Sequence, residues 1–204
     1  IEGLETVSSA CDRYTTGTTD AFAGINGDFF NISAHKEFPI GAPRGGGASE
    51  GIIQREPRSM EWAFAAIDDN NKPILDNMAF SGSVVSLKAP IASYTFNDVN
   101  LPRTDCYSCD MTFYNEFAGG YTRMDENAEI GDKLKTEVFF KLADGQAWKI
   151  NSPITCIVTR IIKDTEGKNA LKPGEAALSG IDQAKGFLDK LTVGQKLKIN
   201  MTIK

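Results

Sequence analysis

The stretch Ile154-Thr155-Cys156-Ile157-Val158-Thr159-Arg160-Ile161-Ile162 follows Ser152-Pro153 and is rich in β-branched and apolar residues. Its apolar side chains occupy both odd and even positions, whereas a strand with one solvated face alternates between apolar and polar residues. A run that is apolar on both faces is typical of a strand with neighbours on either side. We therefore predict that Ile154–Ile162 is a central strand of a sheet.

Working outward, the run Lys196–Lys204 alternates strictly between polar and apolar residues. This period of two predicts a final strand that directs Leu197, Ile199, Met201 and Ile203 inward and its lysines into water. Other segments have the β-branched and aromatic composition of strands between turn residues. They are the hairpin Met60–Ile67 with Pro73–Leu75, and the strands Ala21–Ile25, Ser83–Leu87, Ile91–Phe96, Met111–Tyr114 and Glu137–Leu142.

Two segments have helical periodicity instead. Residues 3–14 place apolar or small side chains at positions i, i+3, i+4 and i+7, which predicts a short helix. A second short helix is predicted to begin at Ser179-Gly180-Ile181-Asp182 and to end before Gly194, which is a common helix-terminating residue. The residues that share one face of this second helix are Ile181, Ala184, Phe187, Leu188 and Leu191.

These elements predict the α+β class, with a mostly mixed or antiparallel sheet and two or three short helices packed on it. The chain has 204 residues, of which 41% are hydrophobic, so it can bury a substantial core. Its 19 glycines and 8 prolines indicate many turns. No repeat and no clear linker divides the sequence, so we predict a single domain over residues 1–204.

The charge balance argues against one class of partner. The chain has 22 basic and 27 acidic residues, a net charge of −5, and no basic cluster. Nucleic-acid-binding domains carry a basic patch or stripe, so we expect no nucleic-acid partner. No apolar run reaches the length of a membrane span, so we expect no membrane-spanning segment either.

Four cysteines occur, two of them as Cys106-x-x-Cys109. A structural zinc site generally needs four nitrogen or sulfur ligands, and the only histidine, His35, is distant in sequence. We therefore expect no metal and no cofactor. The cysteine pair is interpreted as a loop disulfide or as reduced packing thiols, and the sequence leaves these two alternatives open.

A second informative stretch is Ala23-Gly24-Ile25-Asn26-Gly27-Asp28-Phe29-Phe30-Asn31. An apolar run ends here in an Asn-Gly step, and Gly27 permits a backbone conformation that a Cβ would obstruct. Asn26, Asp28 and Asn31 place polar side chains beside aromatic rings that we expect to be buried. Such polar groups either stabilise the fold or contact a ligand, and spacing alone does not separate these interpretations.

Residues 32–58 have no periodicity and contain Pro39, Pro43 and Pro57. We predict a long loop that could cover a site. Its run Gly45-Gly46-Gly47 resembles a phosphate-binding loop only superficially, because no Gly-Lys-Ser/Thr follows and no βαβ pattern surrounds it. A mononucleotide site is therefore not predicted.

Several motifs occur in a shared order from about Ala21 to Ile203. The first is Ala23–Phe30. The next are the Pro/Gly-rich loop with the Trp62–Leu75 hairpin, Asn100-Leu101-Pro102-Arg103 with Phe113-Tyr114 and Thr122 downstream, and Pro173–Gly180 before the helix end Leu188–Gly194 and the final strand. In this order the motifs resemble the phosphodiester glycosidase family, whose signature has Asn-Gly, then Gly or Asp, then two phenylalanines, and later an Asn-x-x-Arg.

The resemblance implies hydrolysis of a sugar-1-phosphodiester, such as an N-acetylglucosamine-1-phosphodiester, in glycans of the cell envelope or outside the cell. Arg103 is then a catalytic residue that neutralises the phosphate, because a guanidinium binds phosphate oxygens through two parallel hydrogen bonds. Asp28 is the catalytic carboxylate, as a base, nucleophile or sugar ligand, although the family often has Gly at this position. Asn26, Gly27 and Asn100 are the implied substrate-binding residues.

Two family segments that help to build the pocket, an Arg-Thr-Ala step and an Asp-Gly-Gly-Gly-Ser segment, do not occur at the corresponding places. The chain therefore resembles the N-terminal and middle part of a longer domain. We expect this domain to be incomplete at both ends and completed by a C-terminal segment of the same protein. Two alternatives remain: a non-catalytic carbohydrate- or phosphoglycan-binding envelope module, and a structural envelope protein in which the Asn26-Gly27-Asp28 turn is scaffolding.

Overall fold

The structure is a computed structural model, and it divides into two compact units, residues 1–45 and residues 46–204. The prediction of one domain over residues 1–204 stays a prediction. The predicted strand Ala21–Ile25 lies outside the described residues from its second position onward, as does the stretch 23–31. The described residues are 6–21, 46–49, 51–55, 63–68, 70–77, 79–88, 90–100, 110–123 and 134–203.

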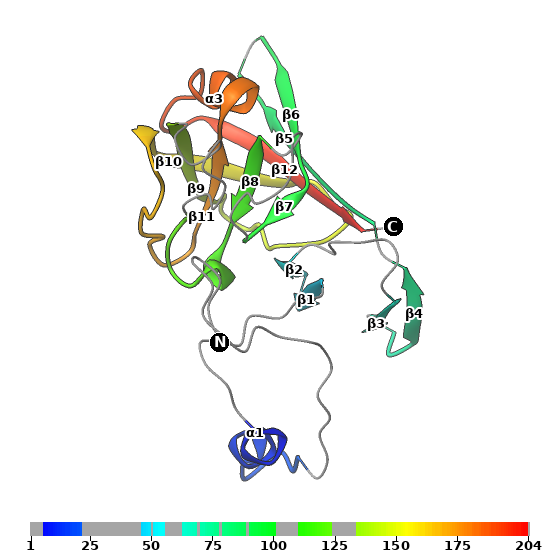
Figure 1. Cartoon of the computed structure of the whole chain (residues 1–204). Helices are drawn as coiled ribbons and strands as arrows, with labels where there is room; N and C mark the ends of the chain where they lie inside the picture. Colours follow the sequence, from blue (N-terminus) through cyan, green and yellow to red (C-terminus); the bar gives the residue numbers. More distant parts are fainter. Residues whose placement is uncertain are drawn as a thin grey trace. The chain divides into compact units, whose positions relative to one another are not determined.

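In the first unit, α1 (Val7–Tyr14) confirms the predicted N-terminal helix (Figure 1). Thr6 caps it, because its side-chain oxygen accepts a hydrogen bond from the backbone N–H of Ser9 at 3.2 Å. At the other end, the backbone N–H of Thr15 donates to the carbonyl of Cys11 at 2.9 Å. No residue of α1 is buried, so capping and backbone hydrogen bonds define this helix.

The second unit is built around an eight-stranded sheet with the order β6–β5–β12–β10–β9–β11–β8–β7. Neighbouring strands are antiparallel except β7 and β8, which are parallel. The fold is therefore mostly β with a mixed sheet and, among the described residues, two short α-helices, which confirms the predicted class. The strands are β5 (Phe80–Ser86), β6 (Ala92–Phe96), β7 (Asp98–Val99), β8 (Met111–Tyr114), β9 (Lys135–Leu142), β10 (Ile154–Thr165), β11 (Glu175–Gly180) and β12 (Lys196–Ile203).

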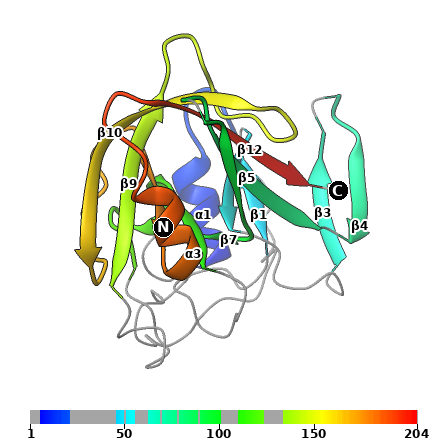
Figure 2. The same ribbon diagram turned by 90° about the horizontal axis from the view of Figure 1, so that it is seen from above.

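The sheet is nearly closed into a barrel (Figures 1 and 2). Only Asn97 separates β6 from β7, although these strands form opposite edges of the sheet. The chain itself therefore brings the two edges together. Phe96 of β6 stacks on Phe113 of β8 with 5.6 Å between ring centroids, so aromatic packing fills the seam. Closure of this kind removes most of the exposed strand edges that would pair with other chains.

The predicted central strand is confirmed as β10, which pairs with β12 on one side and β9 on the other. It continues three residues beyond the predicted end, to Thr165. Its register with β9 shifts between Val158 and Arg160 and again between Ile162 and Thr165. Such bulges bend a strand and redirect its side chains, which helps a long strand follow a strongly curved sheet.

The main core lies on the inner face of this sheet and receives apolar side chains from all eight strands. Helix α3 (Asp182–Leu188) covers one end of the sheet, since it contacts β6 as well as β9 and β11 (Figure 2). All five residues of the predicted apolar face are buried, but the helix is shorter than predicted: Ser179 and Gly180 belong to β11, Ile181 is the N-cap and Leu191 follows the helix end. In β12, Leu197, Ile199 and Met201 are fully buried as predicted.

Strand β11 was not predicted, and its neighbours explain why. Its residues Ala176 and Ala177 have low strand propensity, but they stand opposite Phe140 and Phe139 of β9. On the other side, Ala177 stands opposite Tyr114 of β8. Small side chains in the middle strand make room for large rings on both neighbours, so cross-strand packing decides the conformation of this segment.

Two small hairpins complete the second unit. Strands β1 (Gly47–Ser49) and β2 (Ile52–Arg55) lie within residues 32–58, so the prediction of a continuous loop there was wrong for this part. Strands β3 (Ala63–Ile67) and β4 (Pro73–Asn77) confirm the predicted hairpin. Its turn is held by Asp68, whose Oδ1 accepts hydrogen bonds from the backbone N–H groups of Asn70 and Lys72, each at 2.8 Å.

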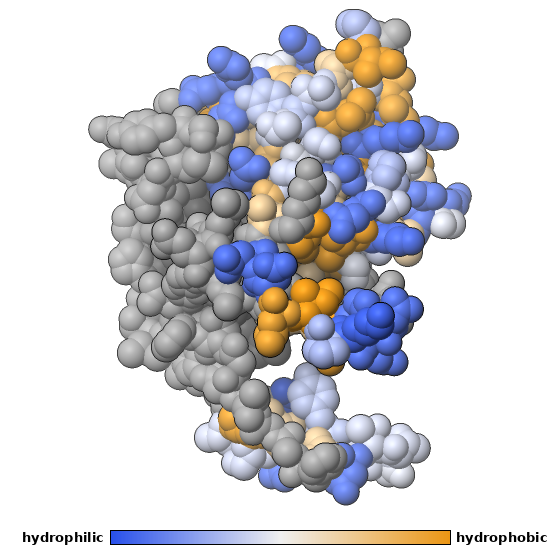
Figure 3. Space-filling model, turned by 90° about the vertical axis from the view of Figure 1, so that its right-hand side faces the viewer, coloured by the Kyte–Doolittle hydropathy of each residue, from blue (hydrophilic) through white to orange (hydrophobic). Residues whose placement is uncertain are grey.

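The surface mixes side chains of different polarity. In Figure 3, the described part of one face shows separate apolar patches between polar and charged side chains. Hairpin β3–β4 contributes exposed apolar residues, with Ile67 74% and Leu75 81% exposed. Among the described residues, no helix combines the length and apolar character needed to cross a membrane.

Candidate functional site

Four of the five predicted site residues, Asn26, Gly27, Asp28 and Arg103, lie outside the described residues. Their predicted roles therefore stay predictions. The fifth, Asn100, is described, and it directly precedes the segment that contains Arg103. The described candidates are therefore Asn100 and several polar groups that the sequence did not single out.

Asn100 follows β7 in a left-handed conformation, with φ of +59°, which asparagine tolerates better than most residues. Its side chain is buried and forms a reciprocal pair with Asn115. Nδ2 of Asn100 donates to Oδ1 of Asn115 at 2.8 Å, and the backbone N–H of Asn115 donates to Oδ1 of Asn100 at 2.9 Å. Nδ2 of Asn100 also donates to the carbonyl of Gln54 at 2.8 Å.

Asn115 extends this pair to two further segments. Its Nδ2 donates to the carbonyl of Ile53 at 2.8 Å, and its Oδ1 accepts from the backbone N–H of Phe117 at 3.0 Å, which caps the 3₁₀ turn Glu116–Ala118. The two asparagines therefore join β2 to the main sheet: each donates one side-chain amide hydrogen to a β2 carbonyl, and a second amide hydrogen of Asn100 goes to Asn115. This is a structural role for Asn100. Its predicted contact with substrate stays a prediction.

A row of polar residues crosses the outer face of the sheet, which is the face of β7, β8, β11 and β9 opposite the core. Thr112 of β8 stands in register with Ser179 of β11, which stands in register with Glu137 of β9. All three side chains are completely buried. Asp98 of β7 continues the row beyond Thr112. Three neighbouring strands thus place consecutive polar groups on one buried surface, with about 4.8 Å between strands.

Glu137 is the carboxylate of this row, and both hydrogen bonds that it accepts reach the same oxygen. Oε2 accepts from Oγ1 of Thr122 at 2.9 Å and from Nδ2 of Asn169 at 2.8 Å. Oε1 has no hydrogen-bond partner among the described residues. The hydroxyl oxygen of Thr112 is unpartnered there in the same sense. Buried polar atoms without partners are uncommon in native proteins and call for a ligand, water or functional explanation.

Two cations border the row. Lys135 lies two residues before Glu137 on the same strand, and its Nζ donates to the carbonyls of Arg123 at 3.2 Å and Glu166 at 2.7 Å. The Arg123 guanidinium lies over the Tyr121 ring, 4.7 Å from its centroid. Gly167 allows the backbone of its segment to lie close to the Arg123 carbonyl: it has a φ of +105°, and a Cβ there would lie 2.5 Å from the Arg123 carbonyl oxygen.

A second buried carboxylate on the outer face, Glu175 of β11, is bound differently. Its Oε2 lies 3.1 Å from the guanidinium of Arg160, and its Oε1 accepts from Oγ1 of Thr159 at 2.9 Å. Burial raises the pKa of Glu175, but hydrogen bonds from Arg160, the Lys172 backbone and Thr159 outweigh it, so the net pKa is lowered. Both oxygens of Glu175 therefore accept hydrogen bonds, whereas in Glu137 only Oε2 does so among the described residues.

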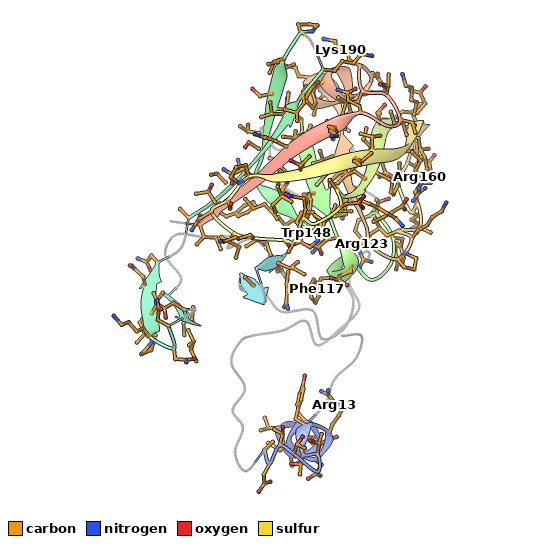
Figure 4. All side chains as sticks on the ribbon, turned by 180° about the vertical axis from the view of Figure 1, so that it is seen from behind. Arg13, Phe117, Arg123, Trp148, Arg160 and Lys190 are labelled. Carbon is orange, nitrogen blue, oxygen red and sulfur yellow. The ribbon has the colours of Figure 1, made fainter. Side chains whose placement is uncertain are left out.

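Arg123 and Arg160 both lie next to the chain segment of residues 165–170. Arg160 donates to the carbonyl of Ala170, and Ala170 pairs with Tyr121 in an isolated β-bridge. Figure 4 shows Arg160 and Arg123 on the same side of the sheet. The segment between them, residues 165–170, also supplies Asn169 to Glu137, so it closes one side of the polar row.

A third carboxylate, Asp110, anchors α3. Its Oδ2 accepts from the Tyr94 hydroxyl and from the backbone N–H of Ala184, the latter at 3.1 Å. Burial, the hydrogen bond to Asp110 and the nearby negative charges of Asp110 and Asp182 raise the pKa of Tyr94 well above its ordinary value. Because these contacts occupy the carboxylate at the first turn of the helix, we interpret Asp110 as a structural cap.

Among the described residues, neither a metal-binding cluster nor a free thiol belongs to the polar row of the outer face. In the parts of the chain that the structure describes, no group of three or more His, Cys, Asp or Glu side chains could hold a metal ion. Cys11 and Cys156 are free thiols, and burial raises the pKa of Cys156 to about 12. Cys106 and Cys109 lie outside the described residues, so the choice between a disulfide and reduced thiols stays open.

Sequence reasoning missed Glu137, although a signal was present. A carboxylate near the start of a strongly apolar strand, Thr136-Glu137-Val138-Phe139-Phe140, is costly unless it is bound or functional. Alternation alone placed Glu137 at the strand start without identifying its surroundings. Its partners Thr122 and Asn169 are distant in sequence and irregular in structure, so only the tertiary fold identifies them.

The fold is similar to two solved structures. One is a crystal structure of a putative exported protein from Burkholderia pseudomallei, with 19% identity and a TM-score of 0.69, covering 98% of this chain and 40% of that one. The other is a hypothetical protein from Synechocystis, with 14% identity and a TM-score of 0.54, covering 87% of this chain and 28% of that one. No family model and no curated protein matches the chain. At these identities the likeness concerns the fold alone, and the chain spans less than half the length of either structure.

Proposed function

We propose that the chain is part of a hydrolase of the phosphodiester glycosidase family, which cleaves the bond between a sugar and a phosphodiester. The observation that supports it most is the shared order of the sequence motifs, from Asn26-Gly27-Asp28 through Asn100–Arg103 to Pro173–Gly180. A short motif alone is weak, whereas several in a fixed order over most of the chain are much less probable by chance.

The chemistry of the reaction fits the polar groups available. Cleavage at the anomeric carbon passes through an oxocarbenium-like transition state, which carboxylates stabilise or assist by proton transfer. A phosphodiester leaves with negative charge on its oxygens, and a guanidinium such as that of Arg103 can bind two of them at once. Asp28 is the proposed carboxylate at the sugar. Asn26, Gly27 and Asn100 are the proposed substrate-binding residues.

The proposed location is outside the cytoplasm, in the cell envelope or beyond it. Its support is the similarity of fold to a protein from Burkholderia pseudomallei that is described as a putative exported protein. The substrates proposed for this location are glycans with sugar-1-phosphodiester links, such as N-acetylglucosamine-1-phosphodiesters. The proposal concerns the whole protein, in which a further segment would complete the pocket.

A second candidate function is a carbohydrate- or phosphoglycan-binding module without turnover. It is favoured by the lack of the Arg-Thr-Ala and Asp-Gly-Gly-Gly-Ser segments at their expected places. Binding of a glycosyl phosphodiester with no release of sugar would support this second candidate over the hydrolase.

The test is hydrolysis of an N-acetylglucosamine phosphodiester by the full-length protein, measured as the free sugar that is released. We expect Arg103→Ala and Asn26→Ala each to lower kcat/KM by about tenfold or more, since each removes a group that binds developing charge or orients the substrate. Lys190→Ala is the control, because Lys190 is exposed on the loop after α3 (Figure 4). Unchanged rates in both variants would remove those two residues from the site.

A further inference from the structure

Two turns at one end of the barrel carry exposed apolar side chains. The turn between β5 and β6 exposes Leu87 by 40% and Ile91 by 73%, and the turn between α3 and β12 exposes Val193 by 64%. Figure 1 shows the β5–β6 turn and α3 at the same, upper end of the sheet, and Figure 3 shows apolar side chains gathered at that end. We call Leu87, Ile91 and Val193 the apolar tip.

The buried side chain of Gln195 holds the two turns together. Its Oε1 accepts a hydrogen bond from the backbone N–H of Thr192 at 3.1 Å, and its Nε2 donates to Oγ of Ser86 at 2.6 Å. The backbone N–H of Leu87 also donates to the carbonyl of Lys196 at 3.2 Å. The apolar tip and the residues around it therefore form one surface, although two separate segments of the chain build it.

The same two turns are basic. Residues 86–93 and 190–198 contain four lysines and no acidic residue, although the whole chain has 27 acidic and 22 basic residues. All four lysines are exposed, and no ion pair among the described residues involves any of them. This cluster is not visible along the sequence, because Ser86 and Gln195 are 109 positions apart. The four are Lys88, Lys190, Lys196 and Lys198.

The acidic residue next to these lysines in the chain is paired elsewhere. Asp189 precedes Lys190, and its Oδ1 accepts from Oγ1 of Thr136 at 2.6 Å. Its carboxylate also forms ion pairs with Lys185 at 3.0 Å and Lys163 at 3.7 Å. Because two other lysines already balance this charge, Asp189 does not neutralise the basic turns.

We propose that this end of the barrel docks on a membrane surface that contains anionic lipids. The apolar tip enters the boundary between headgroups and acyl chains, and the surrounding lysines contact the lipid phosphates. Apolar side chains beside lysines are the combination with which proteins bind a bilayer surface without crossing it. This docking is independent of the proposed hydrolysis, and a membrane surface fits the location proposed above.

Two other occupants fit this surface less well. A soluble polyanion would pair with the lysines but would leave Ile91 and Val193 exposed to water. A second copy that meets the same face would place lysines opposite lysines, because an interface between identical copies around a dyad is self-complementary and like charges repel. A bilayer offers anionic and apolar groups at neighbouring depths, so it complements both parts of the surface.

The test is flotation of the full-length protein with vesicles of phosphatidylcholine, either alone or mixed with phosphatidylglycerol. We expect binding to the anionic vesicles and binding weaker by about tenfold or more to the neutral ones, since each lysine near an anionic surface contributes roughly a fivefold factor. Salt at about 1 M should weaken the binding to anionic vesicles, because it shortens the Debye length to about 3 Å.

Variants separate the two parts of the surface. Ile91→Ser with Val193→Ser tests the apolar tip, and we expect it to lower the partition coefficient by about tenfold or more. Replacing three lysines with glutamine tests the charge, with an expected loss of about tenfold or more. Exposed residues elsewhere supply matched controls, which should stay within about twofold of the wild type. The lysine set is Lys88, Lys190 and Lys196, and the controls are Ile67→Ser with Leu75→Ser, and Lys72, Lys149 and Lys172 to glutamine.

Thermal denaturation verifies that each variant folds. Absence of binding to both kinds of vesicle, or equal binding to both, overturns the proposal. Equal losses in the test and control lysine sets also overturn it, because the attraction would then depend on total charge and not on this surface. If the serine variant binds like the wild type, the apolar tip does not enter the bilayer and the proposed docking is wrong. None of these outcomes changes the proposed hydrolysis, which is measured on a soluble substrate.

Discussion

Asn100 and Asn115 hold each other through two hydrogen bonds, from Nδ2 of Asn100 to Oδ1 of Asn115 at 2.8 Å and from the backbone N–H of Asn115 to Oδ1 of Asn100 at 2.9 Å. Each also donates a side-chain amide hydrogen to β2, Asn100 to the carbonyl of Gln54 and Asn115 to the carbonyl of Ile53. This pair connects residues that are 46 and 62 positions apart in the chain. It therefore belongs to the tertiary structure rather than to any one element.

Replacing either asparagine with alanine should destabilise the protein. Asn115→Ala leaves the buried carbonyl of Ile53 and the backbone N–H of Phe117 without their partners, and we expect a loss of about 1–3 kcal/mol in the free energy of unfolding. Asn100→Ala should lose a similar amount, and the double variant should lose less than the sum, because the residues share bonds. Urea denaturation measures all three. The exposed Asn97→Ala is the control, and simple additivity would contradict the pairing.

Gly82 lies beneath the ring of Phe96 in the seam of the barrel. A Cβ at Gly82 would come within 2.1 Å of that ring, so Gly82→Ala forces the ring or the strand to move. We expect a loss of about 1–3 kcal/mol, as for other overpacked cores. Gly186→Ala is the matched control, because it lies inside α3 with nothing within 4 Å of the new Cβ, and it should be neutral or stabilising by up to about 1 kcal/mol. Equal thermal stability of the two variants would mean that Phe96 does not pack as described.

The ion pair of Glu175 and Arg160 should make stability depend on pH. The pKa of Glu175 is lowered in the folded protein from an ordinary value of 4.5, so its contribution is fully present above about pH 4.5 and is lost as pH falls through the folded pKa. The difference in free energy of unfolding between the wild type and Glu175→Gln should therefore be constant from pH 7 to about pH 5 and shrink below pH 4.5. Denaturant titrations at several pH values measure it. A difference that stays the same down to pH 3 would exclude this linkage.

The thiol of Cys156 should be unreactive in the folded protein. It is completely buried, and burial raises its pKa to about 12, so almost no thiolate forms at pH 8. In a Cys106→Ser, Cys109→Ser background, iodoacetamide should modify Cys11 first and Cys156 only after denaturation, as read by peptide mass spectrometry. Rapid modification of Cys156 without denaturant would show that this part of the core opens readily.

Much of the fold was predictable because hydrophobic periodicity is a local property. Apolar residues on both faces identified β10 as central, strict alternation identified β12, and helical spacing identified the buried face of α3. Strand β11 was not predictable in this way, because its alanines have low strand propensity and pack against rings of the neighbouring strands, Ala177 between Phe139 and Tyr114 and Ala176 opposite Phe140. The hairpin β1–β2 was also missed, since its short strands carry little periodic signal.

The site was predictable only in part. Asn100 was singled out from a motif, and the structure gives it a hydrogen-bonding partner, Asn115, that no local pattern indicates. Glu137 was read as part of an apolar strand, because its binding partners Thr122 and Asn169 lie in irregular segments 15 and 32 residues away. Spacing along a strand says which face a side chain occupies, but not which groups from distant segments meet it there.

The sequence by itself determined the class of this fold, its central and final strands and the buried face of its second helix, because burial of apolar side chains follows the periods of strand and helix. Only the tertiary structure decided the barrel closure through Asn97, the pairing of Asn100 with Asn115 and the orientation of the Glu137 carboxylate. These depend on contacts between segments far apart in the chain. Hydrogen bonds have directions that only the folded positions of donor and acceptor define.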